Sequence, residues 1–171
     1  KFYIHSLEGH TTSVYSTENF VKIKDIHHVF GKENQFLFNK NETEDYIFRT
    51  KKYDLNSFKG KPVEGCFSHD GRYLWVTYYR RSYDLNAIDP SAVCVIDTET
   101  DSIVRVLPTG ALPKMISCSA DNKTIAITHW GDNTVILVDI SSPNPSDFKL
   151  KESIIIDYKP KLNFKKGEKV N

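Results

Sequence analysis

Short apolar segments separated by turn-forming residues run along most of this chain. Residues 92–97, 102–107 and 134–139 are examples, each rich in valine, isoleucine or threonine. Short runs of this kind, bounded by Gly, Pro, Asn, Asp or Ser, are typical of β-strands. No segment sustains the 3.6-residue period of an amphipathic helix. The pattern therefore predicts an all-β protein.

A repeat connects two parts of the chain. Residues 62–77 and 113–128 align without a gap at an offset of 51 positions. Each copy contains a strand, a turn with an Asp-Gly or Asp-Asn pair, and a second strand. Asp, Asn and Gly tolerate the positive φ that tight hairpin turns require. The expected third and fourth strands of the two copies are 92–97, 102–107, 134–139 and 153–156.

A weaker copy lies upstream, where residues 26–38 follow the same pattern at an offset of 37. It aligns Phe36 and Phe38 with aromatic residues of the stronger copy and predicts a third strand at 46–49. The N-terminal segments fit the second, third and fourth strands of one more unit. The predicted units are 1–25 (partial), 26–60, 61–110 and 111–158, with 159–171 as a basic tail or the start of a further unit.

Three segments resemble the YVTN repeat: VCVIDTET at 93–100, LPTGALP at 107–113 and SADNK at 119–123. SHDGRYLWVT at 68–77 matches the same repeat's S-x-D-G-x-x-L-Y-V-T segment. Repeats of this type, about forty residues long, build β-propellers in surface-layer and other extracytoplasmic proteins. The resemblance implies propeller blades of four antiparallel strands and an extracytoplasmic location (periplasmic, cell-surface or secreted).

Residues 1–171 would then be a single, partial β-propeller domain of about three and a half to four blades, whereas propellers have roughly 4–8. The sequence is compatible with two ways of completing the propeller ring. The C-terminal strand completes the N-terminal blade of a small four-bladed ring, or another chain or segment completes a larger propeller. The second is preferred, because similar repeat families close with more blades and Lys1 is not a natural start.

Packing between blades predicts the core, because sheets stack face to face in this architecture. The residues expected there are Phe67, Tyr73, Trp75, Ile96, Ile125, Ile127 and Val138.

Composition and charge exclude some classes of binding partner. The formal net charge of +1 gives no electrostatic case for nucleic acid, and no apolar run is long enough for membrane insertion. Three cysteines without Cys-x-x-Cys spacing indicate buried free thiols rather than a disulfide framework or a zinc site. No nucleophile elbow, phosphate-binding loop, metalloprotease or haem motif is present. No cofactor or metal is expected.

The loop after Thr77 is nine residues longer than its counterpart in the next repeat. It carries Tyr and Arg, types that are enriched at interface hot spots, and the next blade offers His and Trp at the matching place. A partner-binding patch is therefore predicted on this top face. Its residues are Tyr79, Arg80, Arg81, Tyr83, His129 and Trp130.

Three functions are compatible with these features. The first is a non-catalytic scaffold that binds a protein or glycan partner through the top-face loops. The second is a lactonase-like or cofactor-bearing propeller enzyme, and the third is a structural part of a larger surface assembly. The innermost strands offer few titratable groups, with Glu64 and Lys114 the exceptions. This scarcity disfavours an enzyme and favours the scaffold.

Overall fold

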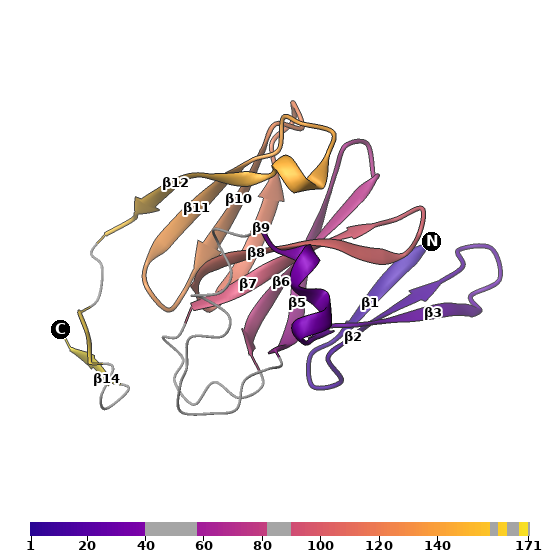
Figure 1. The fold of residues 1–171 in the computed structure, drawn as a ribbon, viewed down its shortest axis with the longest axis horizontal. Helices are drawn as coiled ribbons and strands as arrows, with labels where there is room; N and C mark the ends of the chain where they lie inside the picture. Colours follow the sequence, from indigo (N-terminus) through magenta and orange to yellow (C-terminus); the bar gives the residue numbers. More distant parts are fainter. Residues whose placement is uncertain (40–57, 82–89, 158–160, 164–167, 171) are drawn as a thin grey trace.

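The computed structural model describes residues 1–39, 58–81, 90–157, 161–163 and 168–170. The regular structure of these residues is strand, apart from two short 3-10 helices, which confirms the all-β prediction. Figure 1 shows three antiparallel sheets fanned side by side, with a small hairpin apart from them near the C-terminus.

The strands follow the chain order within each sheet. The first sheet contains β1 (Phe2–Ser6), β2 (Thr11–Tyr15) and β3 (Lys22–His27). The second contains β4 (Val29–Phe30), β5 (Phe58–Ser68), β6 (Tyr73–Arg81), β7 (Pro90–Asp97) and β8 (Ser102–Ala111). The third contains β9 (Pro113–Cys118), β10 (Thr124–His129), β11 (Thr134–Asp139) and β12 (Lys149–Ile155). The hairpin is β13 (Lys161–Asn163) with β14 (Glu168–Val170), and the 3-10 helices are η1 (Lys32–Leu37) and η2 (Pro145–Asp147).

The strong repeat forms equivalent hairpins in the second and third sheets. β5 and β6 recur as β9 and β10, with the same antiparallel pairing. The turns have the backbone that their sequences predict, since Asp70, Gly71 and Asn122 have φ values of 54°, 88° and 55°. Only short polar residues and glycine enter this left-handed region at little cost.

The three strands of the first sheet have the same directions as the three outer strands of the second and third sheets. The turn after β1 lies beside the start of β5, because His10 Nδ1 is 2.8 Å from the Gly60 carbonyl oxygen. Gly60 pairs with Arg81, where β6 finishes. β1 and β6 therefore end at the same end of their sheets, called the His10 end below. β1, β2 and β3 thus have the directions of second, third and fourth strands.

The structure differs from the weaker repeat in residues 26–38. The segment that was aligned with a second strand is the 3-10 helix η1, which packs against β8. Phe38 is buried, as a strand residue would be, but Phe36 is 78% exposed. The spacing of aromatic residues therefore does not distinguish a strand here, because it also fits a helical turn that has one buried side. The predicted third strand at 46–49 lies outside the described residues.

Two hydrophobic clusters hold the fan together. Tyr73, Trp75, Ile125, Ile127 and Val138 are buried between the second and third sheets, as predicted. Ile96 is also buried but packs on the opposite face, between the first and second sheets.

Phe67 is the exception in the predicted core, with 50% of its surface exposed. It lies on the side of β5 that faces the first sheet, where its ring makes only an edge contact with Tyr3. That sheet has no strand inside β1 among the described residues. The prediction for Phe67 is therefore wrong because its neighbour on that side is the narrower first sheet.

The buried guanidinium of Arg105 joins three segments. Its Nη1 donates to the carbonyl oxygens of Val106 at 2.7 Å and of Leu37, in η1, at 3.3 Å. Its Nη2 donates at 3.4 Å to the carbonyl oxygen of Phe148, immediately after η2. β8 therefore supplies one side chain that fixes both 3-10 helices.

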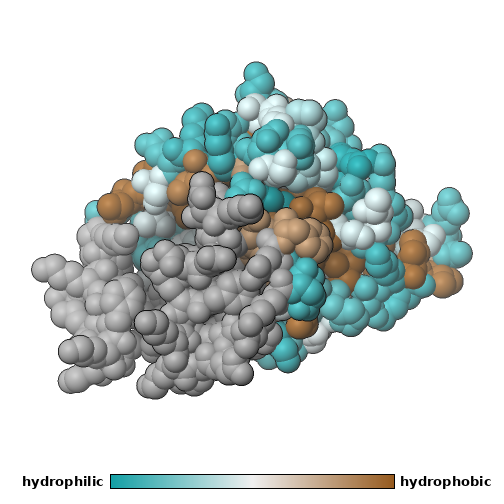
Figure 2. All heavy atoms as spheres, in the orientation of Figure 1, coloured by the Kyte–Doolittle hydropathy of each residue, from teal (hydrophilic) through white to brown (hydrophobic). Residues whose placement is uncertain are grey.

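Exposed apolar side chains gather on the two outer sheets. Figure 2 shows brown patches toward both sides of the molecule and a further one near its centre, on an otherwise largely polar surface. No helix in the described part of the chain is long and apolar enough to cross a membrane. The large exposed apolar residues of the first and third sheets include Ile4, Phe20, Val21, Ile23, Met115, Leu150, Ile154 and Ile155.

Candidate functional site

A charged and aromatic cluster lies near the His10 end of the innermost strands. Lys114 Nζ, on β9, is 3.7 Å from Glu64 Oε1 on β5. The same ammonium group is 5.9 Å from the ring centre of Tyr79 and 5.8 Å from that of Trp130. Both distances are within the range of cation–π attraction. These four residues are called the Lys114 cluster below.

The repeat itself positions this cluster. Thr77 Oγ1 is within hydrogen-bond distance of the carbonyl oxygens of Glu64 at 3.2 Å and Lys114 at 3.3 Å. The same hydroxyl accepts a bond from the Glu64 amide at 3.4 Å. Thr128 makes the equivalent bond to the Met115 amide in the third sheet, at 3.2 Å. Thr77 therefore ties together the three strands that carry Glu64, Tyr79 and Lys114.

The cluster is open to solvent on one side. Trp130 is 61% exposed, and the side chains of Lys114 and Glu64 are 30% and 42% exposed. The Lys114 ammonium group is paired with one carboxylate and lies near two aromatic rings, in partly reduced contact with water. The flat rings offer apolar area to a small cyclic ligand. The arrangement therefore offers a cation and aromatic surface to a ligand on its open side.

The structure brings together two of the six predicted site residues. Tyr79 and Trp130 both flank Lys114. Arg80 and Arg81 lie in the last part of β6, but their side chains are outside the described part. Tyr83 lies wholly outside the described residues.

His129 is not a surface residue, which corrects its assignment to the binding patch. It is buried, and its Nε2 accepts a hydrogen bond from the Gly110 amide at 3.1 Å. Its Nδ1 lies 3.3 Å from the Thr134 carbonyl oxygen, and Thr109 also contacts the ring. Burial lowers the pKa of His129. The imidazole is therefore a neutral brace between β8 and β10.

Two positions of the repeat distinguish the Lys114 cluster in the sequence. At the 51-residue offset, Lys114 aligns with Val63 and Glu64 aligns with Met115. Two charges thus depart from the repeat at neighbouring positions on adjacent inner strands. These two differences between the copies are the feature of the sequence that coincides with the cluster.

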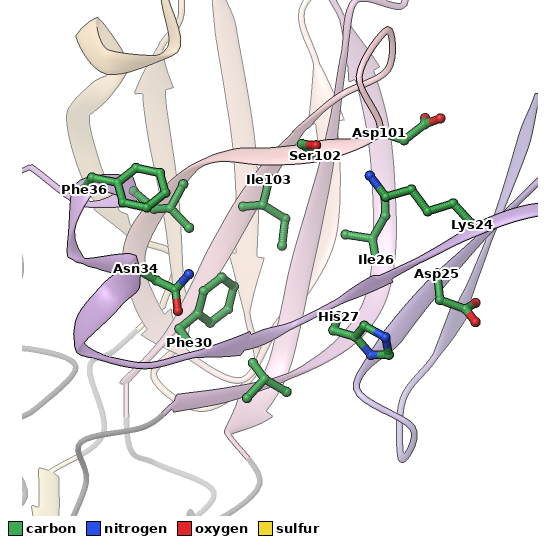
Figure 3. Close-up of a pocket in the computed structure, with 12 residues that line it drawn as sticks. Lys24, Asp25, Ile26, His27, Phe30, Asn34, Phe36, Asp101, Ser102 and Ile103 are labelled. Atoms are coloured by element: carbon green, nitrogen blue, oxygen red, sulfur yellow. The ribbon is translucent and has the colours of Figure 1, made fainter.

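A separate pocket of about 240 Å³ lies at the outer rim, between β3, η1 and the start of β8. Figure 3 shows Ile26, Phe30 and Ile103 along its apolar side, with Asp25 and Asp101 near its edge. Both carboxylates are committed to lysines of the same chain, Lys22 at 2.8 Å and Lys1 at 2.7 Å. The pocket therefore offers apolar volume but little free charge for chemistry.

No protein-family description and no curated protein matches this sequence. Solved structures do resemble the fold. Hydrazine synthase of Kuenenia stuttgartiensis superposes with a TM-score of 0.61 at 17% identity, over 92% of this chain and 33% of that chain. An inferred 6-phosphogluconolactonase of Bacteroides uniformis gives a TM-score of 0.57 at 13% identity, over 92% and 38%. The periplasmic gluconolactonase of Pseudomonas aeruginosa gives 0.52 at 11% identity, over 93% and 40%.

These comparisons correct one functional expectation. The similar structures carry the names of enzymes, two of them lactonases, so the expected non-catalytic scaffold is wrong and the enzyme alternative is better supported. The chain spans 33 to 40% of the length of these three proteins. At this level of identity the likeness establishes the architecture: the chain has the β-propeller fold, and its sheets are propeller blades.

Proposed function

We propose that this chain belongs to a lactonase-like propeller enzyme that hydrolyses a sugar lactone. The observation that carries the proposal is the Lys114 ammonium between two aromatic rings at the inner strands. The lactonase names of two structures with the same fold support it. The periplasmic location in the name of one of them supports an extracytoplasmic location here.

Lactone hydrolysis makes specific demands that this cluster meets. Water attacks the carbonyl carbon of a cyclic ester, and negative charge develops on the carbonyl oxygen. A preorganised cation near that oxygen lowers the barrier. Lys114 supplies the cation, and Glu64 at 3.7 Å holds it in place. Tyr79 and Trp130 supply flat surfaces for the sugar ring, which keeps the carbonyl beside the ammonium group.

The test is hydrolysis of glucono-1,5-lactone and of its 6-phosphate, measured as acid release against the spontaneous rate in buffer. Replacing Lys114 with methionine keeps the length of the side chain but removes the charge. We expect kcat/KM to fall about 100-fold, as for loss of one oxyanion-stabilising group. The matched control is Lys123→Met, which removes an exposed lysine from the opposite end of the sheet.

Two results would contradict the proposal. One is a wild-type rate equal to the spontaneous rate with both lactones. The other is equal kcat/KM for the wild type and Lys114→Met, which would place any hydrolysis at another site. For the second result, Lys123→Met must be folded and as active as the wild type.

A further inference from the structure

The third sheet has apolar side chains on both of its faces. Ile125 and Ile127 of β10 and Val138 of β11 pack against the second sheet. Successive strand residues point to opposite faces, so the residues between them form a free face. The free-face residues of the three outer strands are Ala126, Thr128, Val135, Leu137 and Ile154. An antiparallel sheet with one solvated face would have mostly polar residues there. This face is therefore suited to packing against another sheet.

The free face of the first sheet is apolar and aromatic. Tyr3 of β1 and Val14 of β2 pack toward the second sheet. Alternation then places Phe2, Ile4 and Tyr15 on the other side. Phe2 pairs with Tyr15, and their rings stack with centres 5.2 Å apart. Ile4 is 50% exposed. Large side chains therefore cover this end of the fan in Figure 1.

The turn between β2 and β3 presents one more ring on this face. Phe20 is 72% exposed, and its ring centre is 6.1 Å from that of Phe2. Its φ is 58°, a region that bulky side chains rarely enter. The turn is fixed by bonds from the Ser16 amide to the Val21 carbonyl oxygen at 3.0 Å and from the Val21 amide to Asn19 Oδ1 at 3.1 Å. A strained backbone thus holds an apolar ring in solvent, and such an outlier points to an interaction surface.

The two free faces differ in the size of their side chains. The first sheet offers three aromatic rings, whereas the third offers alanine, threonine and short aliphatic residues. Sheets interdigitate well when large side chains on one meet small side chains on the other. Two first-sheet faces together would crowd their rings, and two third-sheet faces together would leave gaps. The two faces therefore fit each other better than either fits itself.

We propose that a second copy of this chain covers both free faces, with the first sheet of each copy packed on the third sheet of the other. The described residues form three blades. Two copies joined in this way supply about six, within the usual 4–8 of a closed propeller. Contacts between unlike faces close into a ring when the rotation between copies allows it. The inference is independent of the proposed hydrolysis, because neither face contains a residue of the Lys114 cluster.

The area of the faces is sufficient for a specific pair. The first sheet has three strands of five or six residues. Three strands of that length cover about 14 by 17 Å. A closed pair has two contacts and therefore buries four such faces, on the order of 1,000 Å², which is the area that a specific interface needs.

Sedimentation velocity of the purified chain tests the pairing. We expect a concentration-dependent equilibrium between the 19.7 kDa chain and a species of twice that mass. Phe20→Glu places a charge in the aromatic face and should raise the Kd of the pair at least about 30-fold, as for loss of an interface hot spot. Phe36→Glu is the matched control, because it makes the same change at a ring that is 78% exposed but lies on η1. It should leave the Kd unchanged.

Three results of this experiment would overturn the proposal. One is a wild-type chain that stays a monomer at every concentration, and another is a species heavier than two copies. The third is an equal rise in Kd for Phe20→Glu and Phe36→Glu, because the aromatic face would then have no special part in the pairing. Melting temperatures equal to that of the wild type show that both variants are folded.

Mixing two variants tests which faces meet. Leu137→Glu, in the third-sheet face, should also separate the pair, and Ile154→Glu replaces it if Leu137→Glu lowers the melting temperature. A mixed pair of Phe20→Glu and Leu137→Glu keeps one contact with both faces intact, so the mixture should pair more tightly than either variant alone. A wild-type Kd for both third-sheet variants, or a mixture no tighter than its components, would overturn the packing of unlike faces.

Discussion

Replacing Trp75 with alanine should lower the free energy of unfolding by about 3–5 kcal/mol. The indole ring is fully buried between the second and third blades. It stacks on Phe148 with ring centres 5.4 Å apart, and its Nε1 donates to Ser68 Oγ at 3.0 Å. The substitution removes this packing, leaves a cavity, and deprives the Ser68 hydroxyl of its donor.

Urea unfolding followed by circular dichroism measures this loss. Trp130→Ala is the matched control, because it makes the same chemical change at a residue that is 61% exposed. Its cost should stay near 1 kcal/mol, the value of a surface cation–π contact. Equal losses in the two variants would show that Trp75 does not join the blades as described.

Acid should destabilise the protein through His28. Burial is the main cause that lowers the pKa of His28 to about 3, whereas the unfolded chain has a value near 6.5. Between these values the unfolded state binds more protons than the folded state, so stability falls as pH falls. The loss begins below about pH 6.5 and reaches about 1.4 kcal/mol per pH unit, or about 4 kcal/mol near pH 3.5.

The measurement is the free energy of unfolding at intervals from pH 7 to pH 4. His28→Gln should flatten the slope, since glutamine has no proton to gain, whatever its effect at pH 7. His27→Gln changes the adjacent, exposed histidine and should keep the wild-type slope. If His28→Gln lost stability with acid as steeply as the wild type, other groups would be responsible.

Much of the blade architecture could be predicted from the sequence, because the same types of turn and strand residue recur in both copies of the repeat. Tight turns need positive φ, and Asp70, Gly71 and Asn122 provide it in both copies. Alternation in β6 and β10 directs Trp75 and Ile127 into the same interface, which the period of two predicts. The YVTN resemblance itself stays a prediction, as no comparison names that family.

What the sequence could not reveal depends on contacts between distant strands. His129 is the last residue of β10 and precedes a turn, where an exposed residue is common, yet Gly110 and Thr134 enclose it. The Lys114 cluster needs the register of β5, β6 and β9 together, including irregular pairing in β5 between Gly60 and Gly65. Side-chain direction after such an irregularity does not follow from alternation.

The buried guanidinium of Arg105 has a further consequence for how the protein opens. Because it bonds to Leu37, the last residue of η1, and to Phe148, the residue after η2, the two 3-10 helices share an anchor. Their opening should therefore be cooperative. The rates of amide hydrogen exchange near η1 and near η2 should then rise together when the protein is destabilised. Arg105→Met, which keeps the aliphatic stem, should accelerate exchange at both places and uncouple them, while the central strands β6 and β10 keep their protection.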